Sequence, residues 1–450
     1  MRPLVKYWRS YSIMIAVFLD DGICVEYNKV IAEKYSHKVK STLHKAGFLL
    51  NTEKSVWVPV KNLDWLGLTL DMKLGTLKIT EKRISNITSK INNILNNTYL
   101  SARDLAKLTG MILSTKFVIG HIVQLKTRFL YKAIEDQYSW DKKFNINFYH
   151  EAIREVIFWK TNIVAQNKKH IRSYSIPELK VYSDASNTGM GATFMSQQKT
   201  YEAYKNFSTS ESSQSSTWRE LKAIQFSLNS FAKVIHGKSI LWHTDNIATA
   251  IIIKNGSNKI HLQNIALEIF DTVKANNILL DVTWISRKFN ESADTLSKTI
   301  DYDDWIVTNK CFQFLNKIWG PVTIDRFADN ENKKTYRFNS RYYCENTEAV
   351  EALSTDWSNE TNWLVPPVYL IAKCVKHFLL SETDTRGILI VPFWESATFW
   401  PLIINNDRTF KSFVKDFKFL NNSVRLGNYK GSIIGSSDFH TPMLALLIIV

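Results

Sequence analysis

The sequence predicts a chain of several domains that combines α/β and α+β folds, and three observations support this. At 450 residues, the chain is longer than a single hydrophobic core usually spans. Hydrophobic residues make up 45% and aromatic residues 13% of it, a composition that fits packed globular domains and excludes a disordered chain. Stretches that alternate apolar and polar residues are followed by stretches with helical spacing, in three successive blocks.

Composition also excludes several classes of protein. No apolar run approaches the roughly 18 residues of a membrane span, so we expect no membrane partner. The four cysteines, Cys24, Cys311, Cys344 and Cys374, lack the spacing of a zinc site. We therefore expect an intracellular protein, in the cytoplasm, the nucleus or both.

The positive charge is concentrated in the first third of the chain. Residues 1–177 hold 28 Lys and Arg against 14 Asp and Glu, so they carry 14 of the 15 net positive charges. Tyr, Trp and Phe are interleaved with these cations, a pattern typical of surfaces that follow a phosphate backbone. A merely soluble basic protein is the alternative on charge alone.

The first block predicts a strand–turn–strand around Asp20 and Asp21 and a helix over about 28–47. A second hairpin is expected in "VWVPVKNLDWLGLTLD". Helices follow in "TEKRISNITSKINNILNN" and "SARDLAKLTGMILSTKFVIG", where Ser101 and Asp104 have the spacing of a helix cap. The polar stretch "QNKKHIRSYSIPE" is the expected linker.

The second block predicts the order β-β-β-α-β-α-α-β-α, which indicates a mixed sheet with helices on its faces. Four acidic residues stand at element ends: Asp184 in "YSDAS", Glu220 in "TWREL", Asp245 in "HTDN" and Asp294 in "SADTLS". If the elements pack in this order, the four carboxylates converge at one edge of the sheet. Divalent cations would be needed to offset their repulsion, and an oxygen-only ligand set favours two Mg²⁺ or Mn²⁺ ions.

These motifs, "SDAS…WREL…HTDN…NESADTLS", resemble the RNase H family over about residues 178–300. The resemblance implies that Asp184 and Asp245 are metal ligands shared with the attacking water and the scissile phosphate. It implies that Glu220 completes the second metal near the RNA 2′-OH and that Asp294 completes the first. Many members have a histidine before the last aspartate, where this chain reads "ISRKFN". Three further residues are expected to contact nucleic acid: Asn246, Arg287 and Lys288.

The stretch "AVFLDDGICV" places Asp20 and Asp21 inside an apolar run. Because an unpaired buried carboxylate costs several kcal/mol, the pair is either an exposed hairpin turn or a metal site.

Upstream of an RNase H-like block, this stretch resembles a retroelement reverse transcriptase. "GFLLNTEKS" with Lys54, "LDWLGLTLD" with Trp65 and Gly67, and "SARDLAKLTGMILS" with Arg103 and Lys107 extend the resemblance. It implies that Asp20 and Asp21 bind metal, that Lys54 lies near nucleotide phosphates and that the others contact template–primer. No acidic residue precedes Asp20, so a further metal ligand is missing. We expect the C-terminal part of a longer polyprotein, which does not polymerise alone.

The third block contains "TIDRFADNENKKTY", "NWLVPPVYLI" and "GILIVPFWESATFWPLI", which predict a small α/β domain with a buried strand at the end of the chain. After the two preceding blocks, this order looks like DIRS-type retrotransposons, whose last domain is similar to N6-adenine DNA methyltransferases. That family's Asp-Pro-Pro-Tyr motif is replaced here by Val365-Pro366-Pro367-Val368. We therefore expect a degenerate domain and no S-adenosylmethionine cofactor.

The expected domains are a partial palm over 1–75, a helical thumb and connection over 76–176, an RNase H-like domain over 177–300 and a methyltransferase-like domain over 301–450. The expected activity is metal-dependent hydrolysis of RNA in RNA–DNA hybrids. Expected partners are such hybrids, template–primer and other products of the same element. Two alternatives remain open: a non-catalytic nucleic-acid-binding remnant of a transposable element, and a DNA methyltransferase.

Overall fold

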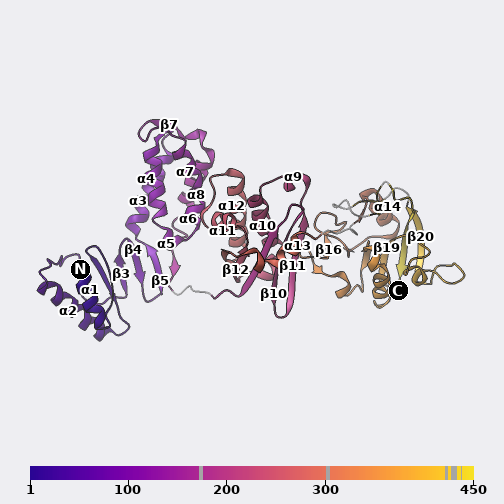
Figure 1. The fold of residues 1–450 in the computed structure, drawn as a ribbon, viewed down its shortest axis with the longest axis horizontal. Coiled ribbons are helices and arrows are strands. Elements are labelled where there is room, and N and C mark those ends of the chain that lie inside the picture. Colours follow the sequence, from indigo (N-terminus) through magenta and orange to yellow (C-terminus); the bar gives the residue numbers. More distant parts are fainter. Residues whose placement is uncertain (172–175, 300–304, 421–423, 427–432, 437) are drawn as a thin grey trace. The chain divides into compact units, whose positions relative to one another are not determined.

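The computed structural model describes residues 1–450 except 172–175, 300–304, 421–423, 427–432 and 437 (Figure 1). The chain forms two compact units: Met1–Ser175 with Asn255–Asn258, and Ile176–Lys254 with Lys259–Val450. The boundary predicted at 300/301 lies outside the described residues. Within the described part, no helix is at once long and apolar enough to cross a bilayer.

The first unit begins with a β-hairpin packed with two helices. Its elements are α1 (Arg2–Ser10), β1 (Met14–Phe18), β2 (Asp21–Val25) and α2 (Lys29–Lys45). β1 and β2 pair antiparallel as a two-stranded sheet. A small core of Trp8, Ile13, Ile15 and Val39 fixes the hairpin to the helices. The predicted strand–turn–strand and the helix that follows it are confirmed.

A four-stranded sheet follows, in the order β3-β4-β5-β8. Its strands are β3 (Asn62–Trp65), β4 (Leu68–Asp71), β5 (Thr76–Ile79) and β8 (Lys169–His170). The β3–β4 turn consists of Leu66 and Gly67 with φ of 51° and 76°, the two-residue turn whose twist matches a hairpin. Asp71 pairs with Thr76, so the domain boundary predicted at 75/76 falls inside the β4–β5 hairpin. The expected linker contributes β8, which pairs with β5.

The remainder of the first unit is mainly helical. Its elements are α3 (Glu81–Leu95), β6 (Tyr99–Ser101), α4 (Ala102–Leu113), α5 (Lys116–Ile119), α6 (Ile122–Leu125), α7 (Arg128–Glu135), β7 (Lys143–Asn145), η1 (Ile146–Phe148) and α8 (His150–Asn162). Ser101 and Asp104 form the predicted capping box at the start of α4. The helical run predicted to continue to Gly120 is instead broken after Leu113. There the Thr115 hydroxyl donates to the Ile112 carbonyl at 2.6 Å and so competes with the helical ladder.

The second unit contains a five-stranded sheet in the order β11-β10-β9-β12-β13. β9, β10 and β11 are antiparallel neighbours, whereas β9, β12 and β13 run parallel. The elements are β9 (Leu179–Ala185), β10 (Gly189–Ser196), β11 (Lys199–Asn206), α9 (Thr209–Ser212), α10 (Ser216–Ile235), β12 (Ser239–Thr244), α11 (Ile247–Asn255), α12 (Ile260–Ala275), β13 (Leu279–Trp284), η2 (Arg287–Phe289) and α13 (Glu291–Ser297). The predicted order of elements is confirmed, with the short α9 added.

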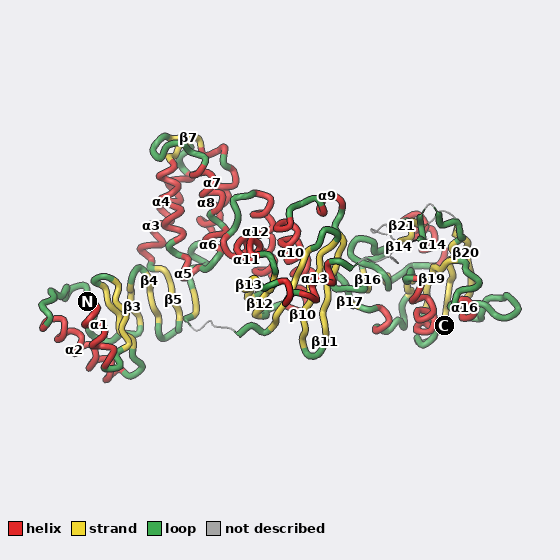
Figure 2. The backbone as a smooth tube through the Cα atoms, in the orientation of Figure 1, coloured by secondary structure: helices red, strands yellow, loops and turns green. Residues whose placement is uncertain are grey.

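Two features of the packing hold together the elements that position the candidate site. Trp242 of β12 donates its indole N–H to the Ser183 hydroxyl of β9 at 2.8 Å, inside the core. α10 and α13 pack on β9 and β10 (Figure 2). A Cβ at Gly191 of β10 would lie 2.9 Å from the Leu296 side chain and 3.0 Å from the Ser297 backbone nitrogen. Glycine at this position therefore allows α13 to lie directly against the sheet.

The C-terminal part of the second unit is a seven-stranded sheet in the order β17-β16-β15-β18-β19-β22-β20. The five strands from β17 to β19 are parallel, and β22 is antiparallel to both neighbours. Its elements and those beside it are β14 (Trp305–Val307), α14 (Asn309–Trp319), β15 (Ile324–Asp325), β16 (Arg337–Ser340), β17 (Ala349–Val350), η3 (Ala352–Ser354), β18 (Thr361–Leu364), η4 (Val368–Leu370), α15 (Ile371–Phe378), β19 (Arg386–Pro392), α16 (Trp400–Ile403), β20 (Val414–Leu420), β21 (Val424–Leu426) and β22 (Met443–Ile449). The predicted α/β character and the buried last strand are confirmed.

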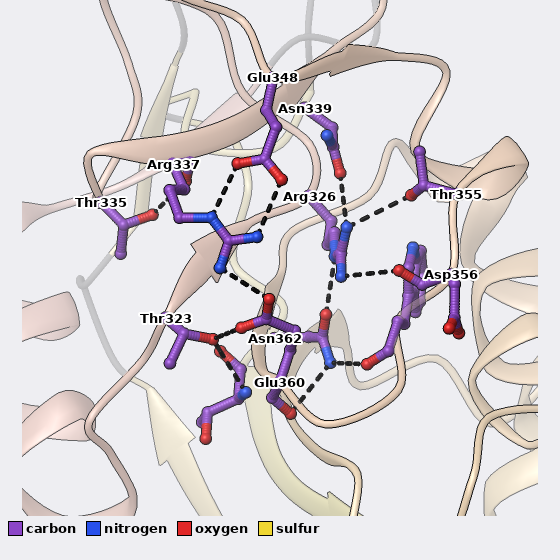
Figure 3. Close-up of polar contacts among 12 residues, drawn as sticks. Thr323, Arg326, Thr335, Arg337, Asn339, Glu348, Thr355, Asp356, Glu360 and Asn362 are labelled. Atoms are coloured by element: carbon purple, nitrogen blue, oxygen red, sulfur yellow. Dashed lines mark hydrogen bonds and ion pairs between the residues drawn. The ribbon is translucent and has the colours of Figure 1, made fainter.

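A buried guanidinium ties the middle of this sheet together. Arg326 donates to Asn362 Oδ1 at 2.7 Å and to Asn339 Oδ1 at 2.9 Å, and also bonds Thr355 and the Asp356 carbonyl (Figure 3). Burial lowers the pKa of Arg326 to about 10. The network joins β16 and β18 to the end of β15 between them.

Candidate metal centre

Three of the predicted acidic residues come from adjacent elements of the five-stranded sheet. Asp184 lies near the carboxyl end of β9, Asp245 follows β12, and Glu220 lies in the second turn of α10. Because β9 and β12 are parallel neighbours, their carboxyl ends meet at the same edge of the sheet. α10 packs across β9 and brings Glu220 to that edge.

The three carboxylates form a compact cluster. Each offers one oxygen, and these oxygens all lie within 4.8 Å of one another. Asp184 is 5% and Glu220 3% exposed, whereas Asp245 is half-buried. Asp245 is therefore more accessible to solvent than the other two.

Hydrogen bonds from the surrounding backbone and hydroxyls hold the two buried carboxylates. The Ala185 N–H donates to Glu220 Oε1 at 3.2 Å, and the Thr244 hydroxyl donates to Oε2 at 3.3 Å. The Ser297 hydroxyl of α13 donates to Asp184 Oδ2 at 2.5 Å. The two side chains are thus positioned by groups from β9, β12 and α13.

The surroundings favour protonation of all three members of the cluster. Burial raises the pKa of Asp184, and the negative charges of Asp245 and Asp294 raise it further, against the Ser297 hydrogen bond. Burial and the charges of Asp184 and Asp245 raise the pKa of Glu220 well above its ordinary value. Burial also raises the pKa of Asp245. Carboxylates that repel one another in this way are stabilised as anions by a bound cation.

Asp294, the fourth predicted carboxylate, is not a member of this cluster and forms ion pairs with two cations. Oδ1 accepts hydrogen bonds from the Arg287 guanidinium, one of them at 3.0 Å from Nε, and Oδ2 accepts from Lys298 Nζ at 2.5 Å. Burial acts to raise the pKa of Asp294, but the hydrogen bonds from Lys298 and Arg287 outweigh it and lower the pKa. Asp294 is close enough to the cluster to raise the pKa of Asp184 and Asp245.

The other predicted residues of this sheet lie around the same edge. Asn246 caps α11, its Oδ1 accepting from the Thr249 N–H at 3.0 Å. Arg287 and Lys288 are both exposed on η2, and Lys288 Nζ lies 4.9 Å from the Phe289 ring centroid. These cations lie in the segment that leads into α13, which carries Asp294.

The predicted residues of the first unit form no comparable cluster within the described part of the chain. Asp20 and Asp21 are exposed at the β1–β2 turn and are in no metal-binding group of the described residues. Lys54 is exposed in a turn. The remaining predicted contacts are Trp65, half-buried, Gly67, in the β3–β4 turn, Arg103, paired with Asp141, and Lys107, exposed.

Sequence reasoning missed three residues that support the site: Thr244, Ser297 and Lys298. Thr244 is adjacent to Asp245, and Lys298 is four residues after Asp294, the spacing at which charged side chains meet on a helix. Those two could have been found from spacing. Ser297 could not, because its contact with Asp184 spans 113 residues of sequence.

The donor set of the cluster fits a hard divalent cation. Its three ligating groups are all carboxylates, which suit Mg²⁺ or Mn²⁺ better than zinc. The geometry of the cluster identifies Asp184, Glu220 and Asp245 as the residues that would hold the ion, and their raised pKa values are consistent with a site whose charge is offset by an ion.

Comparison with known proteins agrees with the position of this cluster. A family model described as the RNase H-like domain found in reverse transcriptase matches residues 177–271. The putative enzymatic polyprotein of Cassava vein mosaic virus is 24% identical over 306 residues, covering 65% of this chain and 44% of the polyprotein. Protein P of duck hepatitis B virus (isolate brown Shanghai duck S5) is 26% identical over 181 residues, 40% of this chain and 21% of protein P. The chain spans less than half the length of each of these relatives.

Solved structures were also matched. A foamy viral protease-reverse transcriptase in complex with double-stranded DNA has a TM-score of 0.34 and 17% identity, covering 63% of this chain and 48% of that one. RNase H1 from Halobacterium salinarum has a TM-score of 0.22 and 17% identity, covering 26% of this chain and 92% of that one. The family match spans β9 to α12 and includes Asp184, Glu220 and Asp245. The chain thus carries an RNase H-like domain of the type found in reverse transcriptases.

Proposed function

We propose that this chain hydrolyses the RNA strand of RNA–DNA hybrids, with two Mg²⁺ or Mn²⁺ ions bound by Asp184, Glu220, Asp245 and Asp294. The observation that carries the proposal is the buried cluster of three carboxylates at one edge of the RNase H-like sheet. Keeping such a cluster costs stability unless a cation offsets it. A metal-dependent reaction accounts for a cluster that costs stability, whereas a purely structural role does not.

The residues of the chain have separate tasks in this proposal. Divalent ions bound here would activate a water molecule and stabilise the leaving oxygen during phosphodiester cleavage. Ser297 orients Asp184 through its hydrogen bond, and Thr244 and the Ala185 N–H orient Glu220. Half-buried Asp245 is the most exposed of the three clustered carboxylates, so in this proposal it is the one most accessible to substrate. Each carboxylate must be deprotonated to bind, so the raised pKa values make ion binding release protons.

We propose that the basic first third of the chain binds the same nucleic acid. Within it, Lys54, Arg103 and Lys107 are exposed cations that suit phosphate contacts in a hybrid or template–primer. Affinity supplied in this way falls steeply as salt increases, because counterions are released on binding. The proposed reverse-transcriptase origin of the first unit rests on these cations together with Trp65 and Gly67 at the β3–β4 turn.

Incubation of the purified chain with a labelled RNA–DNA hybrid and Mg²⁺ tests the proposal. Cleavage of only the RNA strand is expected, with loss of cleavage in Asp184→Asn. Asp281→Asn is the matched control, because Asp281 lies on the same sheet but is 61% exposed and pairs with Lys254. Salt-sensitive hybrid binding without cleavage by the wild-type chain would contradict the enzyme and support the alternative, a non-catalytic nucleic-acid-binding remnant.

The C-terminal sheet has the strand order of a small-molecule-binding α/β domain, which bears on the expected methyltransferase-like origin of this part of the chain. Its strand order reverses between β15 and β18, and ligands of open α/β sheets bind beyond the carboxyl ends of strands at such a point. A cavity of about 630 Å³ lies there, lined by residues that include Asp329, Glu351, Val365, Pro367 and Tyr369. We propose a methyltransferase-like domain of a DIRS-type element that no longer transfers methyl groups, since the Val365 side chain cannot accept a hydrogen bond from a target amino group.

Calorimetric titration with S-adenosylmethionine tests this second candidate. No binding is expected if the domain is a remnant that acts with other products of its element. Binding, followed by methylation of adenine in DNA, would overturn it in favour of a working methyltransferase.

A further inference from the structure

Both carboxylate oxygens of Asp294 are occupied by side-chain cations. Arg287 takes Oδ1 with two of its N–H groups, and Lys298 takes Oδ2. The three residues belong to one short segment, η2 followed by α13. Asp294 is therefore neutralised from within its own segment, without any contribution from the cluster of Asp184, Glu220 and Asp245.

A divalent ion at Asp294 would meet these two cations at close range. A second positive centre near the Arg287 guanidinium and the Lys298 ammonium is repelled, because like charges a few ångströms apart at a protein surface are only partly screened. The side chains of Arg287 and Lys298 differ in exposure to solvent. The Arg287 side chain is 66% exposed and Lys298 50%, whereas the Asp294 side chain is 17% exposed. Arg287 is the cation that can leave with the smaller loss of packing.

We propose that Arg287 and Lys298 occupy the position of a second divalent ion, and that bound nucleic acid draws Arg287 away from Asp294. The inference rests on the proposed function. Without nucleic acid, the site takes one ion, at Asp184, Glu220 and Asp245. A phosphate group can accept the two N–H groups of Arg287 that Asp294 Oδ1 now accepts, and it can do so with two oxygens rather than one. Oδ1 of Asp294 is then available to the second ion while Lys298 stays on Oδ2, so ion binding and substrate binding reinforce each other.

Arg287 and Lys298 are positioning residues in this proposal, so the test measures ion binding rather than catalysis. Mn²⁺ is titrated into the full chain without nucleic acid and followed by electron paramagnetic resonance. The wild type is expected to bind one Mn²⁺ with measurable affinity. Arg287→Ala is expected to bind a second Mn²⁺ about tenfold more tightly than the wild type does, and Arg287→Lys to behave like the wild type.

The matched control is Lys274→Ala. Lys274 is an exposed cation in the last turn of α12, which leads into the start of β13, at the edge of the sheet opposite the carboxylate cluster. Its replacement is expected to leave Mn²⁺ binding unchanged. In a second measurement, a hybrid with a non-cleavable 2′-O-methyl RNA strand is expected to raise the bound Mn²⁺ from one to two in the wild type.

The outcomes separate this inference from the proposed function. One Mn²⁺ in the wild type, lost in Asp184→Asn, with no change in Arg287→Ala, would overturn the role of Arg287 and leave the metal centre standing. No bound Mn²⁺ in the wild type, with or without hybrid, would overturn both. Two equal ions in the wild type without hybrid would also overturn the role of Arg287.

Discussion

Asp184 and Asp20 each stand near the end of a β-strand, yet only Asp184 is packed against other carboxylates. Asp184 is almost fully buried, beside Glu220 and Asp245. Asp20 and its neighbour Asp21 are exposed at a hairpin turn, and no side-chain hydrogen bond or ion pair joins either of them to another described residue. The difference shows that two carboxylates adjacent in sequence need not form a buried cluster. Asp184, Glu220 and Asp245 form one because the three elements that carry them pack at one edge of the sheet.

The largest effect expected from this difference is at Glu220. Glu220→Gln removes a ligand and should lower hydrolysis of the RNA strand at least ~10²-fold, because metal-ion stabilisation of the transition state contributes several kcal/mol. The same change should raise the free energy of unfolding of the ion-free protein by about 1–3 kcal/mol, since the amide is always neutral, whereas the buried Glu220 carboxyl either carries a repelled charge or takes up a proton on folding. Initial cleavage rates and urea denaturation in EDTA measure both. Loss of activity with loss of stability would indicate a structural role instead.

A buried carboxylate outside the cluster sharpens the comparison. Glu155 of α8 accepts hydrogen bonds from the Phe129 and Leu130 N–H groups at 3.2 and 2.9 Å. Burial raises its pKa to about 8, against those hydrogen bonds. The folded chain therefore keeps the Glu155 proton while the unfolded chain releases it. This contribution to stability is fully present below about pH 4.5 and is lost as the pH rises towards 8.

The expected slope is at most about 1.4 kcal/mol per pH unit in that window. Glu155→Gln should remove this part of the pH dependence, since the amide stays neutral while its oxygen can still accept a hydrogen bond. Thermal unfolding between pH 5 and 8 measures it. Equal slopes for the wild type and Glu155→Gln would show that Glu155 is ionised in the folded chain.

The order of elements in the RNase H-like sheet was predictable because strand alternation and helical spacing are local signals. The meeting of Asp184, Glu220 and Asp245 followed from that order, since parallel strands end at one edge. The ion pairs of Arg287 and Lys298 with Asp294 could not be predicted from that order. Several cations lie in the same segment, and only the side-chain geometry determines which two of them contact Asp294. The hydrogen bonds to the Glu155 carboxylate could not be predicted from the sequence either, since their backbone donors lie 25 and 26 residues away.

A substitution at Ser297 tests how much one hydrogen bond to Asp184 contributes to the carboxylate cluster. Ser297→Ala removes the hydroxyl that donates to Asp184 Oδ2. A hydrogen bond to a charged group contributes about 1.5–3 kcal/mol, so the pKa of Asp184 should rise further and Mg²⁺ affinity should fall about tenfold. Isothermal titration with Mg²⁺ measures this, with Ser227→Ala as a control, because the buried Ser227 hydroxyl has no hydrogen-bond partner among the described residues. Unchanged affinity would mean that Ser297 only fills space.

The smallest effect is expected at the hairpin. Asp20→Asn removes a charge that is exposed and has no side-chain partner among the described residues. Surface changes of this kind alter the free energy of unfolding by no more than about 0.5 kcal/mol. Addition of Mg²⁺ should shift the thermal midpoint of Asp20→Asn as much as that of the wild type, because the ion is expected to bind at Asp184, Glu220 and Asp245. A Mg²⁺-induced shift that Asp20→Asn abolishes would place an ion at the hairpin, and the contrast between packed and exposed aspartates would no longer explain where this chain binds metal.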